Sequence, residues 1–94
     1  MDKWIIKYQI TAWSSTGEAN RITVDDLGTA KHIASLNSRI HPAKHLVIKR
    51  LRSQTGWVGG PYYDLVGAYV NGTYYTRLVW RKMHPFNHSK KEVQ

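Results

Sequence analysis

Residues 64–82 read DLVGAYVNGTYYTRLVWRK and contain the clearest local signal in the chain. Asn71-Gly72 stands between residues 64–70 and 73–82. This dipeptide is the one best suited to a two-residue type I′ turn, because both turn positions need a positive φ. The pattern therefore predicts a β-hairpin with strands at 64–70 and 73–82.

A tight turn also fixes which residues face one another across the hairpin. If Val70 opposes Thr73, the face expected to point to the core carries Tyr69 with Tyr74, Gly67 with Thr76, Leu65 with Leu78 and Tyr63 with Trp80. The other face then carries Ala68 with Tyr75, Val66 with Arg77, Asp64 with Val79 and Tyr62 with Arg81. This register predicts interleaved arginines and tyrosines on the side of the sheet away from the core.

The preceding part of the chain predicts three strands and one helix. Apolar and polar residues alternate from Lys3 to Trp13 and again at 21–24, after a turn at 14–18, so these two segments should pair as a hairpin. Asp25 and Asp26 stand where a helix N-cap is wanted, and apolar residues recur at helical spacing over 27–38. Pro42 ends the helical region, and residues 45–53 are predicted to form a strand.

These elements predict an α+β fold of order ββαβββ, in which one helix packs on one face of an antiparallel sheet. The 94 residues suffice for one core but not for a second domain. We expect a single domain at residues 1–82 and a flexible C-terminal tail at 83–94. No cysteine is present, so no disulfide framework, thiolate metal site or cysteine nucleophile is expected.

The charge is strongly positive and belongs to the predicted domain. The chain has 14 Lys and Arg against 6 Asp and Glu, a net charge of +8. Residues 27–82 alone hold nine of these cations and a single acid, Asp64. A basic surface of this kind suits nucleic acid or an acidic protein. The sequence shows neither a signal-peptide h-region nor an apolar run long enough to span a bilayer, so we expect a cytoplasmic protein without a membrane partner.

Two copies of a His-Pro-x-x-His pattern raise the question of a metal site. The first runs from His41 to His45 and the second from His84 to His88. Neither pair is joined by a cysteine or a nearby carboxylate, so we interpret them as solvated loop histidines and expect no metal and no cofactor.

Enzymatic chemistry is not predicted. Hydrolysis by a pair of carboxylates needs two acids, and Asp64 stands alone in the basic region. A small metal-independent ribonuclease that uses Arg, Lys, His and Tyr is kept as a third alternative. The main prediction is a binding protein, because cations neutralise phosphates and exposed aromatic rings stack unpaired bases. The predicted binding residues are Lys31, His32, Lys49, Arg52, Tyr62, Tyr75, Arg77 and Arg81.

Several segments resemble a small phage anti-CRISPR family that acts on type I-F surveillance complexes. They are Trp4-Ile5-Ile6-Lys7, Ile22, Leu27 and Ala30-Lys31-His32-Ile33-Ala34-Ser35, with a looser likeness from Asn71-Gly72 to Trp80. The likeness covers residues 4–48 in order. It implies a non-enzymatic inhibitor that docks where target DNA should lie on a CRISPR complex.

The resemblance also implies that helix cations engage nucleic acid, at a position matched by Lys31, whereas His32 replaces an arginine. The connection at 57–61 and residues 83–94 have no counterpart in that family. The sequence thus leads to three functions: an inhibitor of a CRISPR complex or another nucleic-acid-handling protein, a direct and weakly sequence-selective DNA- or RNA-binding protein, and a small ribonuclease. The oligomeric state is left open.

Overall fold

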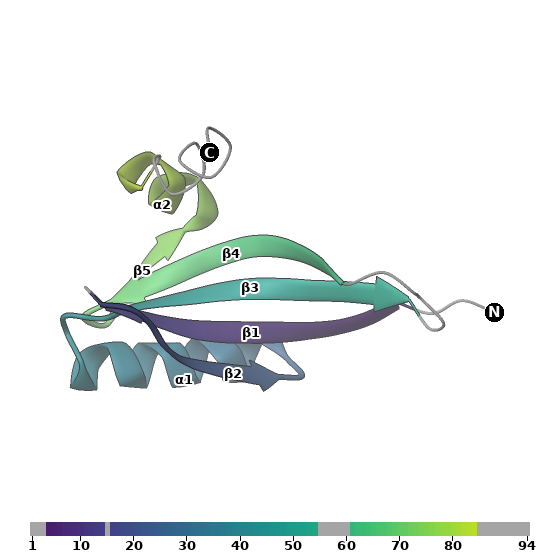
Figure 1. Ribbon diagram of the computed structural model, residues 1–94, viewed down its shortest axis with the longest axis horizontal. Helices are drawn as coiled ribbons and strands as arrows, with labels where there is room; N and C mark the ends of the chain where they lie inside the picture. The colour runs from purple at the N-terminus through teal and green to yellow at the C-terminus, as the bar shows by residue number, and fades with distance from the viewer. Residues whose placement is uncertain (1–3, 15, 55–60, 85–94) are drawn as a thin grey trace.

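A computed structural model describes residues 4–14, 16–54 and 61–84 (Figure 1). The elements are β1 (Trp4–Ser14), β2 (Gly17–Val24), α1 (Leu27–Ile40), β3 (His45–Gln54), β4 (Tyr62–Val70), β5 (Thr73–Thr76) and α2 (Arg77–Met83). The strands form one sheet of order β2-β1-β3-β4-β5, in which every neighbouring pair is antiparallel. The α+β fold is confirmed, with one helix more than the sequence predicted.

Helix α1 begins at a side-chain cap. Asp26 is extended, and its carboxylate accepts hydrogen bonds from the Thr29 backbone N–H at 2.8 Å and from the Thr29 hydroxyl at 2.7 Å. These bonds satisfy donors that the first helical turn leaves unpaired. Asp25 plays a different part, because its carboxylate lies 2.7 Å from Nζ of Lys7.

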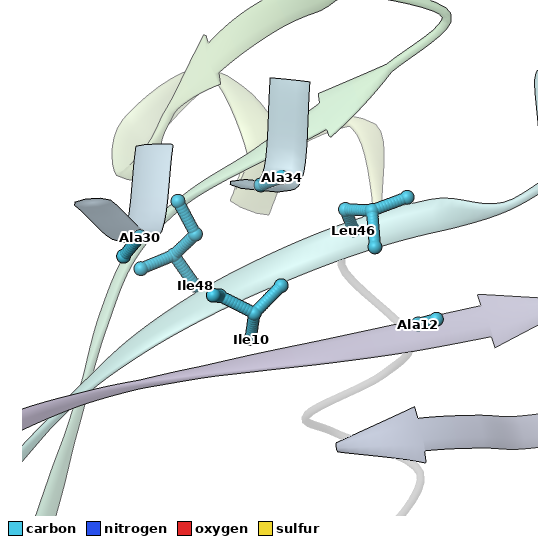
Figure 2. Close-up of a cluster of buried hydrophobic side chains, with 6 residues drawn as sticks. All are labelled: Ile10, Ala12, Ala30, Ala34, Leu46 and Ile48. Atoms are coloured by element: carbon cyan, nitrogen blue, oxygen red, sulfur yellow. The ribbon is translucent and has the colours of Figure 1, made fainter. Parts of the chain in front are cut away.

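The main core lies between α1 and the sheet. Ala30 and Ala34 point from the helix toward the strands and are fully buried (Figure 2). The strands contribute Ile10, Ala12, Leu46 and Ile48. Small side chains on the helix let its backbone approach the sheet closely, and the aliphatic side chains of the strands fill the space between them.

The hairpin at Asn71-Gly72 has the predicted turn and register. Asn71 and Gly72 have φ of 49° and 81°, and Val70 pairs with Thr73, Tyr69 with Tyr74, Ala68 with Tyr75 and Gly67 with Thr76. The buried hydroxyl of Ser38 fixes the turn to α1. It accepts a hydrogen bond from the Gly72 N–H at 2.8 Å and donates one to the Ser35 carbonyl at 2.9 Å.

The second half of the predicted hairpin strand is wrong. β5 ends at Thr76, and residues 77–83 form α2, so Leu65–Leu78, Tyr63–Trp80, Val66–Arg77, Asp64–Val79 and Tyr62–Arg81 are not strand pairs. Val47 and Ala68 lie on the face of the sheet opposite α1. Trp80 of α2 packs against them, and this removes their apolar surface from water. Figure 1 shows α1 and α2 on opposite sides of the sheet.

A register shift between β3 and β4 also changes which side chains share a face of the sheet. Ile48 pairs with Gly67, but its neighbour Lys49 pairs with Leu65, so Val66 is the extra residue of a bulge. A shift of one residue moves every later side chain to the other face. Tyr62 therefore lies on the α1 side of the sheet, with its partner Arg52, whereas Tyr75 lies on the α2 side. The prediction that both tyrosines share one face is wrong.

Beyond α1 the sheet continues as a three-stranded arm, made of residues 4–7 of β1, 50–54 of β3 and 62–64 of β4. β2 pairs with β1 only as far as Tyr8, whereas β1 and β3 stay paired to Trp4 and Gln54. Figure 1 shows β1, β3 and β4 running on past the end of α1. Apolar side chains on the arm are consequently exposed, among them Trp4, Ile5, Ile6, Tyr62 and Tyr63.

Candidate binding site

The eight predicted binding residues do not form one surface. Lys31 and His32 lie on α1, Arg52 and Tyr62 on the arm, Lys49 and Tyr75 on the side of the sheet that faces α2, and Arg77 and Arg81 on α2. Arg77 and Arg81 were expected on a strand, and their placement on a helix is a correction. Of the eight, Arg52 and Tyr62 contact each other, with the guanidinium of Arg52 over the ring of Tyr62.

Arg52 and Tyr62 are joined by Trp4 in a compact group. The guanidinium carbon of Arg52 lies 5.7 Å from the ring centroid of Trp4 and 5.7 Å from that of Tyr62. The two ring centroids are 6.5 Å apart, and the ring planes meet at 45°. Trp4 is 49% exposed and Tyr62 is 48% exposed, so the rings face solvent on the arm. Such distances lie within the range of cation–π attraction.

Asp64 fixes the arginines of this group. Its Oδ2 lies 2.7 Å from Nε of Arg52 and 3.3 Å from an Nη of Arg50. The Nε–H of Arg52 is not aimed at that oxygen, so this contact is an ion pair rather than a hydrogen bond, and the Nε atoms of both arginines are buried without a hydrogen-bond partner in the described part of the chain. We call Trp4, Arg50, Arg52, Tyr62 and Asp64 the aromatic–arginine cluster.

Strand pairing explains why these residues meet. Ile6 pairs with Arg52 and Arg52 with Tyr62, while Tyr8 pairs with Arg50 and Arg50 with Asp64. All lie on the α1 side of the sheet, and all but Tyr8, which packs against the main core, belong to the arm. Sequence reasoning missed Trp4, Arg50 and Asp64 as site residues. A usable signal was present in β3, where the positions in phase with Leu46 and Ile48 change from apolar to Arg50 and Arg52, which indicates that cover ends there.

Lys31 makes an aromatic contact of its own. Its Nζ lies 4.7 Å from the ring centroid of Tyr74, on the hairpin. Burial raises the pKa of Tyr74, and the pKa of Tyr69 is raised by burial and by the neighbouring Tyr74. His32 is exposed on α1.

Helix α2 carries a second exposed surface. Trp80 is buried, whereas Leu78 is 68% exposed and Val79 and Met83 are also exposed. Leu78 and Val79 line a shallow open groove together with Arg81 and Lys82. Tyr75 is half-buried and packs near Trp80, with ring centroids 6.2 Å apart, so this tyrosine forms part of the packing beneath α2.

The expectation of solvated loop histidines is wrong for His45 and His84. The two rings are half-buried and lie 5.4 Å apart, with Trp80 at 5.2 Å from His45 and 4.0 Å from His84. Burial lowers the pKa of His45, and the charge of His84 lowers it further. His41 is exposed in a turn, as expected, and His88 lies outside the described residues. Within residues 4–14, 16–54 and 61–84, no three metal-ligating side chains come together.

Comparisons of this chain with protein families, with curated proteins and with solved structures found no match. The resemblance to the anti-CRISPR family therefore stays a prediction. Neither helix in the described segments has the length and apolar character needed to cross a membrane.

Proposed function

We propose that this chain is a non-enzymatic binding protein of the cytoplasm whose ligand is nucleic acid, contacted by the three-stranded arm. The observation that carries the proposal is the position of Arg52 over two exposed rings, Trp4 and Tyr62. An arginine neutralises phosphate and stacks on planar groups, and exposed aromatic rings offer faces to bases.

The overall charge supports the same ligand. The chain carries a net charge of +8. Exposed cations lie near the arm and also on α2, where they are Arg77, Arg81 and Lys82. Asp64 pairs with two arginines, so the cluster keeps a positive charge. We expect phosphates to be attracted to the whole molecule and held at the arm, where the rings add contacts that charge alone does not provide.

Fluorescence anisotropy with labelled DNA and RNA tests the proposal. We expect Arg52→Ala to weaken binding strongly, whereas Arg52→Lys keeps the charge but loses the planar stacking group and should be intermediate. The matched control is the Arg77→Ala, Arg81→Ala double variant, which removes two cations from α2 and should weaken binding less than Arg52→Ala. If the α2 double variant abolishes binding and Arg52→Ala does not, the arm is not the site.

An inhibitor of a CRISPR surveillance complex is the second candidate function. The apolar and basic surface of α2, with Leu78 and Val79 beside Arg81 and Lys82, favours it because exposed apolar side chains ringed by charge suit docking on a protein. The test adds the chain to a purified type I-F complex and measures target-DNA binding. A loss of target binding that Leu78→Ser and Val79→Ser relieve supports this function. Cleavage of labelled RNA would instead support the ribonuclease alternative.

A further inference from the structure

The rings of Trp4 and Tyr62, in the aromatic–arginine cluster, lie at nearly the separation that a base between two rings requires. Stacked bases lie about 3.4 Å apart, so a base held between two aromatic rings needs those rings roughly 6.8 Å apart. The centroids of Trp4 and Tyr62 are 6.5 Å apart. The present angle of 45° between the planes means that a ring must turn before both faces are parallel to a base.

The surroundings of the rings permit such a turn. Both side chains are about half-exposed, and they lie on the part of the sheet that extends past α1 (Figure 1). A side chain exposed to this degree loses little packing when it changes its torsion angles, unlike the buried rings of a core. Opening the pair gives up the 6.5 Å ring contact, which a base between the rings replaces with two stacking contacts.

Arg52 closes a third side of the space between the rings. Its guanidinium lies 5.7 Å from each centroid, and Asp64 holds it there through the 2.7 Å ion pair at Nε. The terminal Nη groups of an arginine donate hydrogen bonds in a fixed plane, and base edges present carbonyl and ring-nitrogen acceptors in a matching plane. Arg52 can therefore meet the edge of a base whose faces contact the two rings.

We propose that an unpaired base of single-stranded nucleic acid inserts between Trp4 and Tyr62, with its edge hydrogen-bonded to Arg52. This inference rests on the proposed function and adds the ligand class and the mode of contact. A duplex keeps its bases stacked on their neighbours, so a base must first be unpaired and unstacked before it enters, whereas a single strand offers its bases directly. The site is consequently selective for single strands and tolerant of sequence.

The experiment compares three probes of equal length, about 12 nucleotides. They are oligothymidylate, a phosphodiester of abasic tetrahydrofuran residues, and a DNA duplex, each titrated by anisotropy. The abasic probe keeps the phosphates and removes every base. We expect oligothymidylate to bind roughly tenfold or more tighter than the abasic probe and the duplex, because base–aromatic stacking contributes strongly for each base.

Three variants locate the base. Trp4→Ala and Tyr62→Ala should each bring oligothymidylate down toward the affinity of the abasic probe while leaving abasic binding unchanged, and Tyr62→Phe should retain most of the preference. The matched control is Trp13→Ala, which removes an exposed tryptophan from the opposite end of β1. Circular dichroism melts of each variant identify any loss of folding, and a variant that is unfolded is replaced by Trp4→Leu or Tyr62→Leu.

The outcomes separate the two proposals. Equal affinity for oligothymidylate and the abasic probe overturns base insertion but leaves a nucleic-acid-binding protein that contacts phosphates alone. A base preference that Trp13→Ala removes and Trp4→Ala does not also overturns insertion at the arm. If none of the probes binds, the proposed function itself fails.

Discussion

At the scale of single residues, one carboxylate organises the candidate site. Asp64 contacts both Arg50 and Arg52, and Arg52 in turn lies over Trp4 and Tyr62. The carboxylate is about one-third exposed, so its ion pairs add little to the stability of the fold, and their effect is to restrict where the guanidinium groups lie. Two other residues, Gly67 and Asp26, permit sharper predictions about stability.

Gly67→Ala should destabilise the protein by roughly 1–3 kcal/mol, because overpacking forces neighbouring atoms apart. A Cβ at this position would lie 2.6 Å from the backbone carbonyl oxygen of Tyr75 and 2.6 Å from the hydroxyl of Tyr74. The tyrosine hydroxyl can move, but the carbonyl belongs to the paired strand. Urea denaturation measures the effect. Thr73→Ala, at an exposed position of the same hairpin, serves as the control, and equal stability of the two variants would contradict the prediction.

Asp26→Ala should lower the melting temperature, whereas Asp26→Asn should retain most of it, because asparagine also caps helices well. The backbone N–H of Thr29, and after it the Thr29 hydroxyl, lower the pKa of Asp26 below 3.8. A carboxyl whose pKa is lower in the folded chain than in the unfolded chain stabilises the fold at pH values above the unfolded pKa. This contribution is lost as the pH falls through the folded pKa. Thermal melts between neutral and strongly acidic pH should therefore show the gap between Asp26→Ala and the unsubstituted chain closing below 3.8.

At the scale of elements, α2 depends on tertiary contacts. A helix of seven residues is too short to be stable alone, so its packing on the sheet decides whether it forms. Trp80 provides that packing against Val47 and Ala68, and the rings of His45 and His84 lie against Trp80. The first histidine belongs to β3 and the second follows the helix, so this contact joins the sheet to the end of α2.

The pH should consequently affect how firmly α2 packs. Burial lowers the pKa of His45 below its ordinary value of 6.5, so between the folded pKa and 6.5 the unfolded chain binds more protons than the folded one. Stability is full above 6.5 and falls as the pH drops below that value toward the folded pKa. Urea denaturation at several pH values checks this, with tryptophan fluorescence as the signal.

The His45→Phe variant keeps a ring against Trp80 but cannot titrate, so its stability should change less between neutral and mildly acidic pH. His32→Ala, which alters an exposed histidine on α1, should behave like the unsubstituted chain. An unaltered pH profile in His45→Phe would assign the dependence to another group.

At the scale of the whole molecule, charge and shape act together. The chain carries a net charge of +8, and the sheet extends as an arm past α1, so attraction is spread over the molecule while the exposed rings are concentrated at one end. If phosphates provide the attraction, binding of a single strand should weaken with salt, with a log–log slope of about −0.7 for each phosphate contacted. Two contacts give roughly a sevenfold loss between about 50 and 200 mM salt.

Anisotropy titrations across that range measure the slope. The Arg77→Ala, Arg81→Ala double variant removes two of the attracting cations and should reduce the magnitude of the slope, whereas Trp4→Ala should lower affinity at every salt concentration and leave the slope unchanged, because stacking releases no counterions. A slope near zero for the unsubstituted chain would show that charge does not drive the association.

The sequence by itself determined the features that depend on a few neighbouring residues. Asn71-Gly72 specifies its turn through backbone conformation, Asp26 specifies the start of α1 through its own hydrogen bonds, and alternation specifies the sheet. These signals were sufficient for the α+β class, for the order along the chain of the five strands and the long helix, and for naming Arg52 and Tyr62 among the candidate binding residues.

Only the tertiary structure decided which side chains share a face. The bulge at Val66 places Tyr62 on the opposite side of the sheet from Tyr75. Residues 77–83 form a helix because Trp80 then packs on the apolar residues of the face opposite α1. It also decided that Trp4 meets Arg52, because cover by α1 ends before the strands do. Each of these outcomes depends on contacts between segments distant in the chain, which a local pattern does not specify. The change from Leu46 and Ile48 to Arg50 and Arg52 along β3 indicates where the cover ends, but not which side chains meet there.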